Sequence, residues 1–142
     1  MSTLLDTDVV SELLRAAPEP AVLDWFAQQP PETLFVSAVT QAEMMLGARL
    51  PPPGKRRATL EVALRATFDE DFSGRILPFD SAAVPSYVDI VSTRRTAGRP
   101  ISQVDAQIAA VARHHGATLA TRNVDDFEDC GVAVVNPWSR TA

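Results

Sequence analysis

Three acidic residues, Asp6, Glu43 and Asp105, are the side chains of this 142-residue chain best suited to do chemistry together. Each is predicted near a junction between a short apolar strand and a helix. Two carboxylates about 4 Å apart repel each other by roughly 4 kcal/mol at an effective dielectric of 20, so folding does not gather them without a compensating cation. Carboxylate oxygens are hard ligands, and the chain has no Cys or His cluster suited to zinc. We therefore predict a Mg²⁺ site, with Mn²⁺ as the alternative.

A role in helix capping is open to each acid taken alone. Asp6, between a strand and a helix, has the position of an N-cap. Glu43 completes a capping-box pattern, but it falls inside the helix on an apolar stripe if Ser37 is the cap. Asp105 would occupy the first turn of a helix capped by Ser102, again among apolar neighbours. For each acid alone, a capping role and a functional role explain its position equally well. Three acids that point inward at one edge of the sheet favour the metal site.

The elements that position these acids follow from short apolar runs alternating with helical patterns. This alternation indicates a single domain, 1–142, folded as a three-layer α/β/α sandwich with a central, mostly parallel sheet. Ligands of such sheets bind beyond the carboxyl ends of the strands, where Asp6 and Ser37 lie. Strands are predicted over 3–5, 34–36, 75–78, 117–120 and 132–135, and helices over 9–15, 21–28, 38–49, 57–72, 80–97 and 104–115. The fifth helix starts later than residue 80 if Pro85 lies in its first turn.

A fourth site position is predicted in the segment 121–127, which follows a strand and should reach the same edge. Asn123 is well placed but neutral. Asp126 is charged, but it could instead cap the turn that follows. Both are candidate catalytic residues, and the choice between them stays open. Thr7 and Asn123 are also candidates for orienting the carboxylates or waters around the ion.

Composition limits the possible functions. The formal net charge of −5 argues against nucleic-acid binding through bulk charge. The basic run 55–57 and the arginines at 94, 95 and 99 could contact phosphates, but we expect a solvated loop and a solvated helix end. No apolar run approaches the roughly 20 residues of a membrane span. A lone Cys130 fits a reducing compartment, so we expect a cytoplasmic protein without a membrane partner.

The first acidic segment has a rival interpretation. Leu5-Asp6-Thr7-Asp8-Val9-Val10 resembles the opening motif of haloacid-dehalogenase-type phosphatases, in which the first Asp is the nucleophile and the second is the acid/base. That family would require a lysine well downstream, and the only lysine here is Lys55, in a Pro-rich loop. The rival also leaves inward acids at Glu43 and Asp105 without a role. We keep it as the weaker alternative.

Nearly the whole chain resembles the PIN-domain ribonucleases, specifically the VapC toxins of type II toxin–antitoxin pairs. Each motif alone is weak, but four in order with suitable spacing are specific. Some relatives carry an Asp where this chain has Asn123, and others use the later acid, here Asp126. The matching segments are Leu4–Glu12, Ser37–Gly47, Asp105–Ala110 and Leu119–Phe127, while Gly74–Asp80 and Val135–Trp138 further resemble the FitB-like branch.

The resemblance implies a toxin that hydrolyses RNA phosphodiester bonds with the help of a metal ion. Asp6 and Asp105 would bind the principal Mg²⁺, with Glu43 as a direct or water-mediated ligand. The implied partners are RNA, a small antitoxin and a second copy of the chain, with DNA reached only through the antitoxin. Two other function classes stay open: the phosphatase, and a FitB-like subunit acting mainly in a DNA-binding complex.

Overall fold

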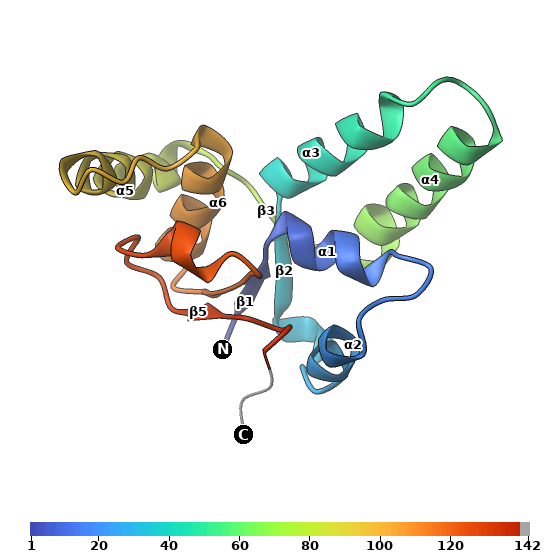
Figure 1. The fold of residues 1–142 in the computed structure, drawn as a ribbon, viewed down its shortest axis with the longest axis horizontal. Helices are drawn as coiled ribbons and strands as arrows, with labels where there is room; N and C mark the ends of the chain where they lie inside the picture. The colour runs from blue at the N-terminus through green and yellow to red at the C-terminus, as the bar shows by residue number, and fades with distance from the viewer. Residues whose placement is uncertain (140–142) are drawn as a thin grey trace.

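A parallel sheet forms the centre of the computed structural model, which describes residues 1–139 (Figure 1). Its five strands are parallel to their neighbours in the order β3-β2-β1-β4-β5. Since β1 lies in the middle, the chain builds one side of the sheet first and the other side last. The predicted parallel sheet is confirmed, and its last three strands along the chain are shorter than predicted. The strands are β1 (Thr3–Leu5), β2 (Leu34–Ser37), β3 (Ile76–Leu77), β4 (Thr118–Ala120) and β5 (Val134–Val135).

Helices cover both faces of this sheet. Adjacent residues of a strand point to opposite faces, so Leu4 packs with the buried cluster that contains Ile90 and Ile108, while Leu5 packs with Val9 and Leu64. The two clusters are the two interfaces of the predicted three-layer sandwich, which is confirmed. The helices are α1 (Thr7–Leu13), α2 (Pro20–Ala27), α3 (Ala38–Arg49), α4 (Lys55–Ala66), α5 (Val84–Thr96) and α6 (Gln103–His114).

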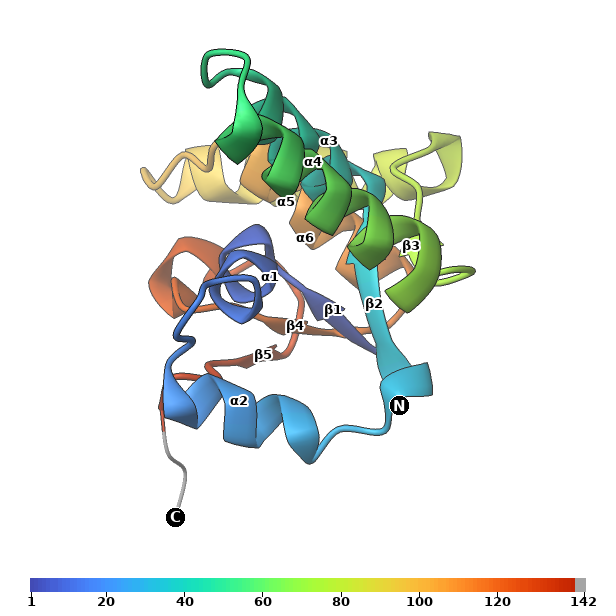
Figure 2. The ribbon, with the colours of Figure 1, turned by 90° about the vertical axis from the view of Figure 1, so that its right-hand side faces the viewer.

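Helices α3 and α4 project beyond the sheet as an adjacent pair (Figures 1 and 2). Helix α3 begins directly after β2, and its 12 residues span about 18 Å at 1.5 Å per residue. Met45 and Leu46 are 45% and 60% exposed, so little packs on this side of the arm. Because α3 begins directly after β2 and then leads away from the sheet, only its start lies at the carboxyl edge.

The predicted helix 57–72 is interrupted after α4. It continues as a π-helical turn, Thr67–Asp71. The Thr67 hydroxyl donates to the Ala63 carbonyl at 2.9 Å, a side-chain bond that competes with the backbone ladder. Sequence periodicity did not reveal this change, because the apolar residues Phe68 and Phe72 stay buried through it.

Helix α5 begins at Val84 rather than at residue 80. Pro85 therefore falls in its first turn, where the missing N–H leaves no hydrogen bond unmade. The expectation of a solvated helix end is wrong for Arg94, which is 5% exposed. Within residues 1–139, no helix is long and apolar enough to cross a membrane.

Candidate active site

Asp6 lies directly after β1 and caps helix α1. Its Oδ1 accepts a hydrogen bond from the Thr7 backbone N–H at 2.8 Å, and its Oδ2 accepts one from the Thr121 hydroxyl at 2.7 Å. Burial, followed by the charge of Asp8, raises the pKa of Asp6 to about 7 in spite of these two bonds. A smaller contribution comes from Asp105. The capping role and a functional role thus coexist, because this buried carboxyl lies close to other acids.

Thr121 was not selected by the sequence analysis as a site residue. The β1–β4 register pairs Leu5 with Ala120, which brings the next residues, Asp6 and Thr121, side by side. Thr121 is fully buried, and its hydroxyl holds the inner oxygen of Asp6. The available signal was a hydroxyl directly after an apolar strand, but its partner becomes visible only when the strands are paired.

Asp8 is a second residue that the sequence did not identify as a member of this site. Its Oδ2 accepts hydrogen bonds from the Arg122 backbone N–H at 3.0 Å and from Asn123 Nδ2 at 3.3 Å. Its Oδ1 is buried and has no hydrogen-bond partner in the part of the chain that the structure describes. Burial is the main cause that raises the pKa of Asp8. An unsatisfied carboxylate oxygen is a donor atom available to a cation.

Glu43 lies at the rim of this cluster. The Thr7 hydroxyl donates to Glu43 Oε1 at 2.7 Å and shares a hydrogen bond of 2.9 Å with the hydroxyl of Thr40. The prediction that Glu43 points into the apolar interior is wrong: the residue is exposed. The reason is the projecting arm, which leaves this side of α3 open. Ser37 is the cap of α3, accepting a hydrogen bond from Thr40 N at 3.0 Å, as the sequence suggested.

Asp105 is a half-buried residue in the first turn of α6, which Ser102 caps. Burial raises the pKa of its carboxyl, and the charges of Asp126 and Glu43 raise it further. Asp126 belongs to the single-turn helix η4 (Val124–Phe127) and is exposed. Of the two candidates for the fourth position, Asn123 is engaged with Asp8, whereas Asp126 acts electrostatically on Asp105.

The donor set consists of hard oxygens, which is the chemistry that Mg²⁺ requires. Among residues 1–139, no three histidine, cysteine or acidic side chains are grouped so that they could hold an ion by themselves. Mg²⁺ usually keeps several waters and is bound by one or two carboxylates together with substrate phosphates. Asp6 and Asp105, whose charges interact, and the unsatisfied Asp8 Oδ1 therefore fit the ion, whereas an all-protein cage is absent from the described residues.

Comparison with known families identifies the domain to which these acids belong. The model of the PIN domain matches residues 3–132, a span that includes every acid described above. The chain belongs to the PIN-domain family. The resemblance inferred from the four sequence segments is thereby confirmed.

Individual relatives of this PIN domain are similar over almost their full length. The chain is 43% identical to "VapC ribonuclease Y4jK" of Sinorhizobium fredii, with 95% of this chain and 96% of the relative covered. It is 42% identical to "Toxin FitB" of Neisseria gonorrhoeae, with 95% and 97% covered. The solved structure of FitAB bound to IR36 DNA superposes with a TM-score of 0.92 at 40% identity, covering 99% of this chain and 98% of that one.

The haloacid-dehalogenase alternative is not supported by these comparisons. Lys55, the lysine that this alternative would have needed, begins α4 at the outer end of the arm and is exposed (Figure 1). The second Asp of the motif, Asp8, is instead bound to the segment after β4.

Proposed function

We propose that this chain is the toxin of a type II toxin–antitoxin system and that it hydrolyses RNA phosphodiester bonds with a divalent cation, Mg²⁺ or Mn²⁺. One observation carries the proposal: the Thr121 hydroxyl lies 2.7 Å from Asp6 Oδ2 and 3.4 Å from Asp8 Oδ2, so the two carboxylates are neighbours, and the charge of Asp105 acts on both. Such a cluster is unfavourable without a cation. Its occurrence in a chain 43% identical to a VapC ribonuclease supports nuclease chemistry.

Asp6 and Asp105 would hold the cation, with Glu43 as a direct or water-mediated ligand. Asp8, through its unsatisfied Oδ1, is a further candidate ligand. When bound, the cation lowers the pKa of a water molecule and stabilises negative charge on the phosphate. Asp126 lies near Asp105 and is the better-placed candidate for the fourth position.

The neighbouring residues hold these carboxylates in fixed orientations. Thr121 binds the inner oxygen of Asp6, and Thr7 binds Glu43. Asn123 serves Asp8, which makes it an orienting residue rather than a ligand. Asp6 must lose its proton to accept a cation, and a pKa of about 7 places this step near neutral pH.

The proposed partners follow from the relatives. The solved FitAB complex is bound to DNA, and we propose that this chain likewise pairs with a small antitoxin and forms a homodimer. With a net charge of −5, the chain itself is poorly suited to bind DNA, so DNA contact is assigned to the antitoxin. We place the toxin in the cytoplasm, where its RNA substrate is.

Expression of the chain alone in a bacterial host tests the proposal. Wild type should arrest growth, and Asp6→Asn or Asp105→Asn should relieve the arrest. Asp24→Asn, which changes an exposed acid of α2, is the matched control and should arrest growth like wild type. In vitro, each site variant should cut RNA at least about 100-fold more slowly in Mg²⁺.

Other outcomes separate the alternatives. RNA cleavage at the wild-type rate by both Asp6→Asn and Asp105→Asn would remove the nuclease mechanism. Hydrolysis of a small phosphate ester, abolished by Asp6→Asn and untouched by Asp105→Asn, would revive the phosphatase. No arrest and no cleavage, with DNA bound by the antitoxin complex, would leave only an assembly role.

A further inference from the structure

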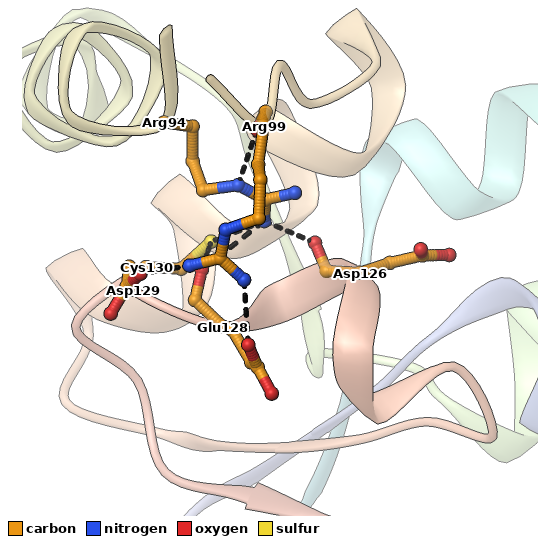
Figure 3. Close-up of polar contacts among 6 residues, drawn as sticks. All are labelled: Arg94, Arg99, Asp126, Glu128, Asp129 and Cys130. Carbon is orange, nitrogen blue, oxygen red and sulfur yellow. Dashed lines mark hydrogen bonds and ion pairs between the residues drawn. The ribbon is translucent and has the colours of Figure 1, made fainter. Parts of the chain in front are cut away.

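Arg94 of α5 is a buried cation that the proposed chemistry does not use. Its guanidinium donates to three backbone carbonyls: Nε to Arg99 at 2.6 Å, and Nη1 to Asp126 at 2.6 Å and to Glu128 at 3.1 Å (Figure 3). The Cys130 sulfur lies 3.8 Å from Nη1. Among residues 1–139, no carboxylate lies within ion-pair distance of this group. Burying a charge without an ion pair is costly, which raises the question of what structural role this side chain performs.

The carbonyls bound by Arg94 belong to segments distant in sequence. Asp126 and Glu128 lie 32 and 34 residues beyond it, at the end of η4. One rigid side chain therefore joins the end of α5 to the turn that carries Asp126. Hydrogen bonds from a charged donor are roughly twice as strong as neutral ones, and the planar guanidinium fixes their directions.

The side chain of Asp126 points away from Arg94, on the other side of its own backbone (Figure 3). Its charge acts on Asp105, as does the opposite charge of Arg94, so both groups lie close to the proposed site. Holding the Asp126 carbonyl on one side determines where its carboxylate projects on the other.

We infer that Arg94 is a positioning residue, which fixes η4 so that the carboxylate of Asp126 faces Asp105 and takes part in holding the cation. The inference rests on the proposed metal site and deepens it. It assigns the fourth position to Asp126 and gives that exposed acid a buried support.

Arg99 provides a matched control on the same loops. Its side chain pairs with the carboxylates of Glu128 and Asp129, and it is 41% exposed (Figure 3). Exposed ion pairs contribute little to stability. Arg99→Gln therefore removes a cationic contact to the same segment while leaving the backbone bonds of Arg94 in place.

The experiment measures Mn²⁺ binding to the full chain from the electron paramagnetic resonance signal of the free ion. Asp126→Asn and Arg94→Met should each weaken binding by about tenfold or more, the usual effect of losing a supporting group at a metal site. In the Asp126→Asn background, adding Arg94→Met should cause no further loss. Arg99→Gln should bind like wild type.

Arg94→Lys keeps the charge and serves if Arg94→Met does not fold. A single ammonium cannot reproduce the fork to three carbonyls, so this variant should weaken Mn²⁺ binding and speed amide hydrogen exchange over residues 124–130. Arg99→Gln should do neither. Wild-type Mn²⁺ affinity in Arg94→Lys, or unchanged exchange in this segment, would overturn the inference.

The remaining outcomes distinguish this inference from the proposed function. If Asp6→Asn binds Mn²⁺ like wild type, the metal site itself is wrong and both fail. If Asp6→Asn loses Mn²⁺ while Asp126→Asn does not, only the role of Arg94 fails. Equal losses from Arg94→Met with and without the Asp126 carboxylate would make Arg94 a general scaffold residue, which also overturns the inference.

Discussion

Asp6 is a carboxyl whose burial opposes its own ionisation. Its two oxygens accept hydrogen bonds from Thr7 and Thr121, which favour the charged form, but burial and the charge of Asp8 outweigh them. The resulting pKa of about 7 means that the residue proposed to bind the cation is also a source of instability without the cation.

The metal-free protein should lose stability relative to Asp6→Asn as the pH rises from about 4 to about 7. The folded chain binds a proton at Asp6 in this range, whereas the unfolded chain has released it, so each pH unit costs up to about 1.4 kcal/mol. Melting temperatures of the two proteins in EDTA, measured across pH, give the difference. A constant difference from pH 4 to 8 would contradict the raised pKa.

Mg²⁺ should stabilise wild type at pH 8, where Asp6 is ionised. A ligand at 100 times its dissociation constant adds about 2.7 kcal/mol to the free energy of unfolding. The melting temperature should therefore rise with Mg²⁺ in wild type and in Asp24→Asn, and hardly at all in Asp6→Asn. An equal rise in all three proteins would place the ion elsewhere.

The N-terminal ends of two helices determine where the acids of the candidate site lie. Ser37 caps α3 and Ser102 caps α6, and these two helices carry Glu43 and Asp105. Each cap lies only a few residues before its acid. A frayed first turn would therefore move the carboxylate as well as weaken the helix.

Ser102→Ala should lower the free energy of unfolding by about 1 kcal/mol, because the Asp105 backbone N–H loses its acceptor. Ser102→Asn should restore most of this loss, since Asn caps as well as Ser. Urea unfolding measures both. Ser92→Ala, which changes an exposed serine of α5, is the control and should stay within about 0.5 kcal/mol of wild type. A loss in Ser92→Ala as large as that in Ser102→Ala would contradict the capping role.

Elements with local signals were predictable from the sequence. Apolar runs located all five strands, and Ser37, Ser102 and the Pro-rich loop marked the helix ends. The π-helical turn at Thr67–Asp71 was not predictable, because Phe68 and Phe72 keep a helical spacing and stay buried through it. The partners of Asp8 were not predictable either, because they depend on strand pairing rather than on local sequence.

Exposure was the least predictable property of the candidate site. Glu43 lies on an apolar stripe in the sequence, yet no layer covers this side of the projecting α3–α4 arm. Arg94 shows the opposite error, since a basic helix end proved to be buried. Both depend on which elements pack together, which periodicity alone does not specify.

The acidic edge of the sheet and the basic outer end of the α3–α4 arm lie at opposite ends of helix α3. The tip, which includes Lys55 and Arg56, lies about 18 Å along α3 from the sheet edge. Charges are screened within about 8 Å at physiological salt. Lys55→Gln with Arg56→Gln should therefore change RNA cleavage by less than about twofold. A rate that falls strongly, and falls more at low salt, would show that substrate reaches the arm.

The central position of β1 has a consequence for how the protein is made. Asp6 is synthesised within the first few residues, but Thr121 and Asp126 arrive with β4 and η4, near the end of translation. A nascent chain that has completed only its first three strands still lacks Asp105, Thr121 and Asp126. Under the proposed function, RNA cleavage should therefore begin only after β4 and η4 have been synthesised.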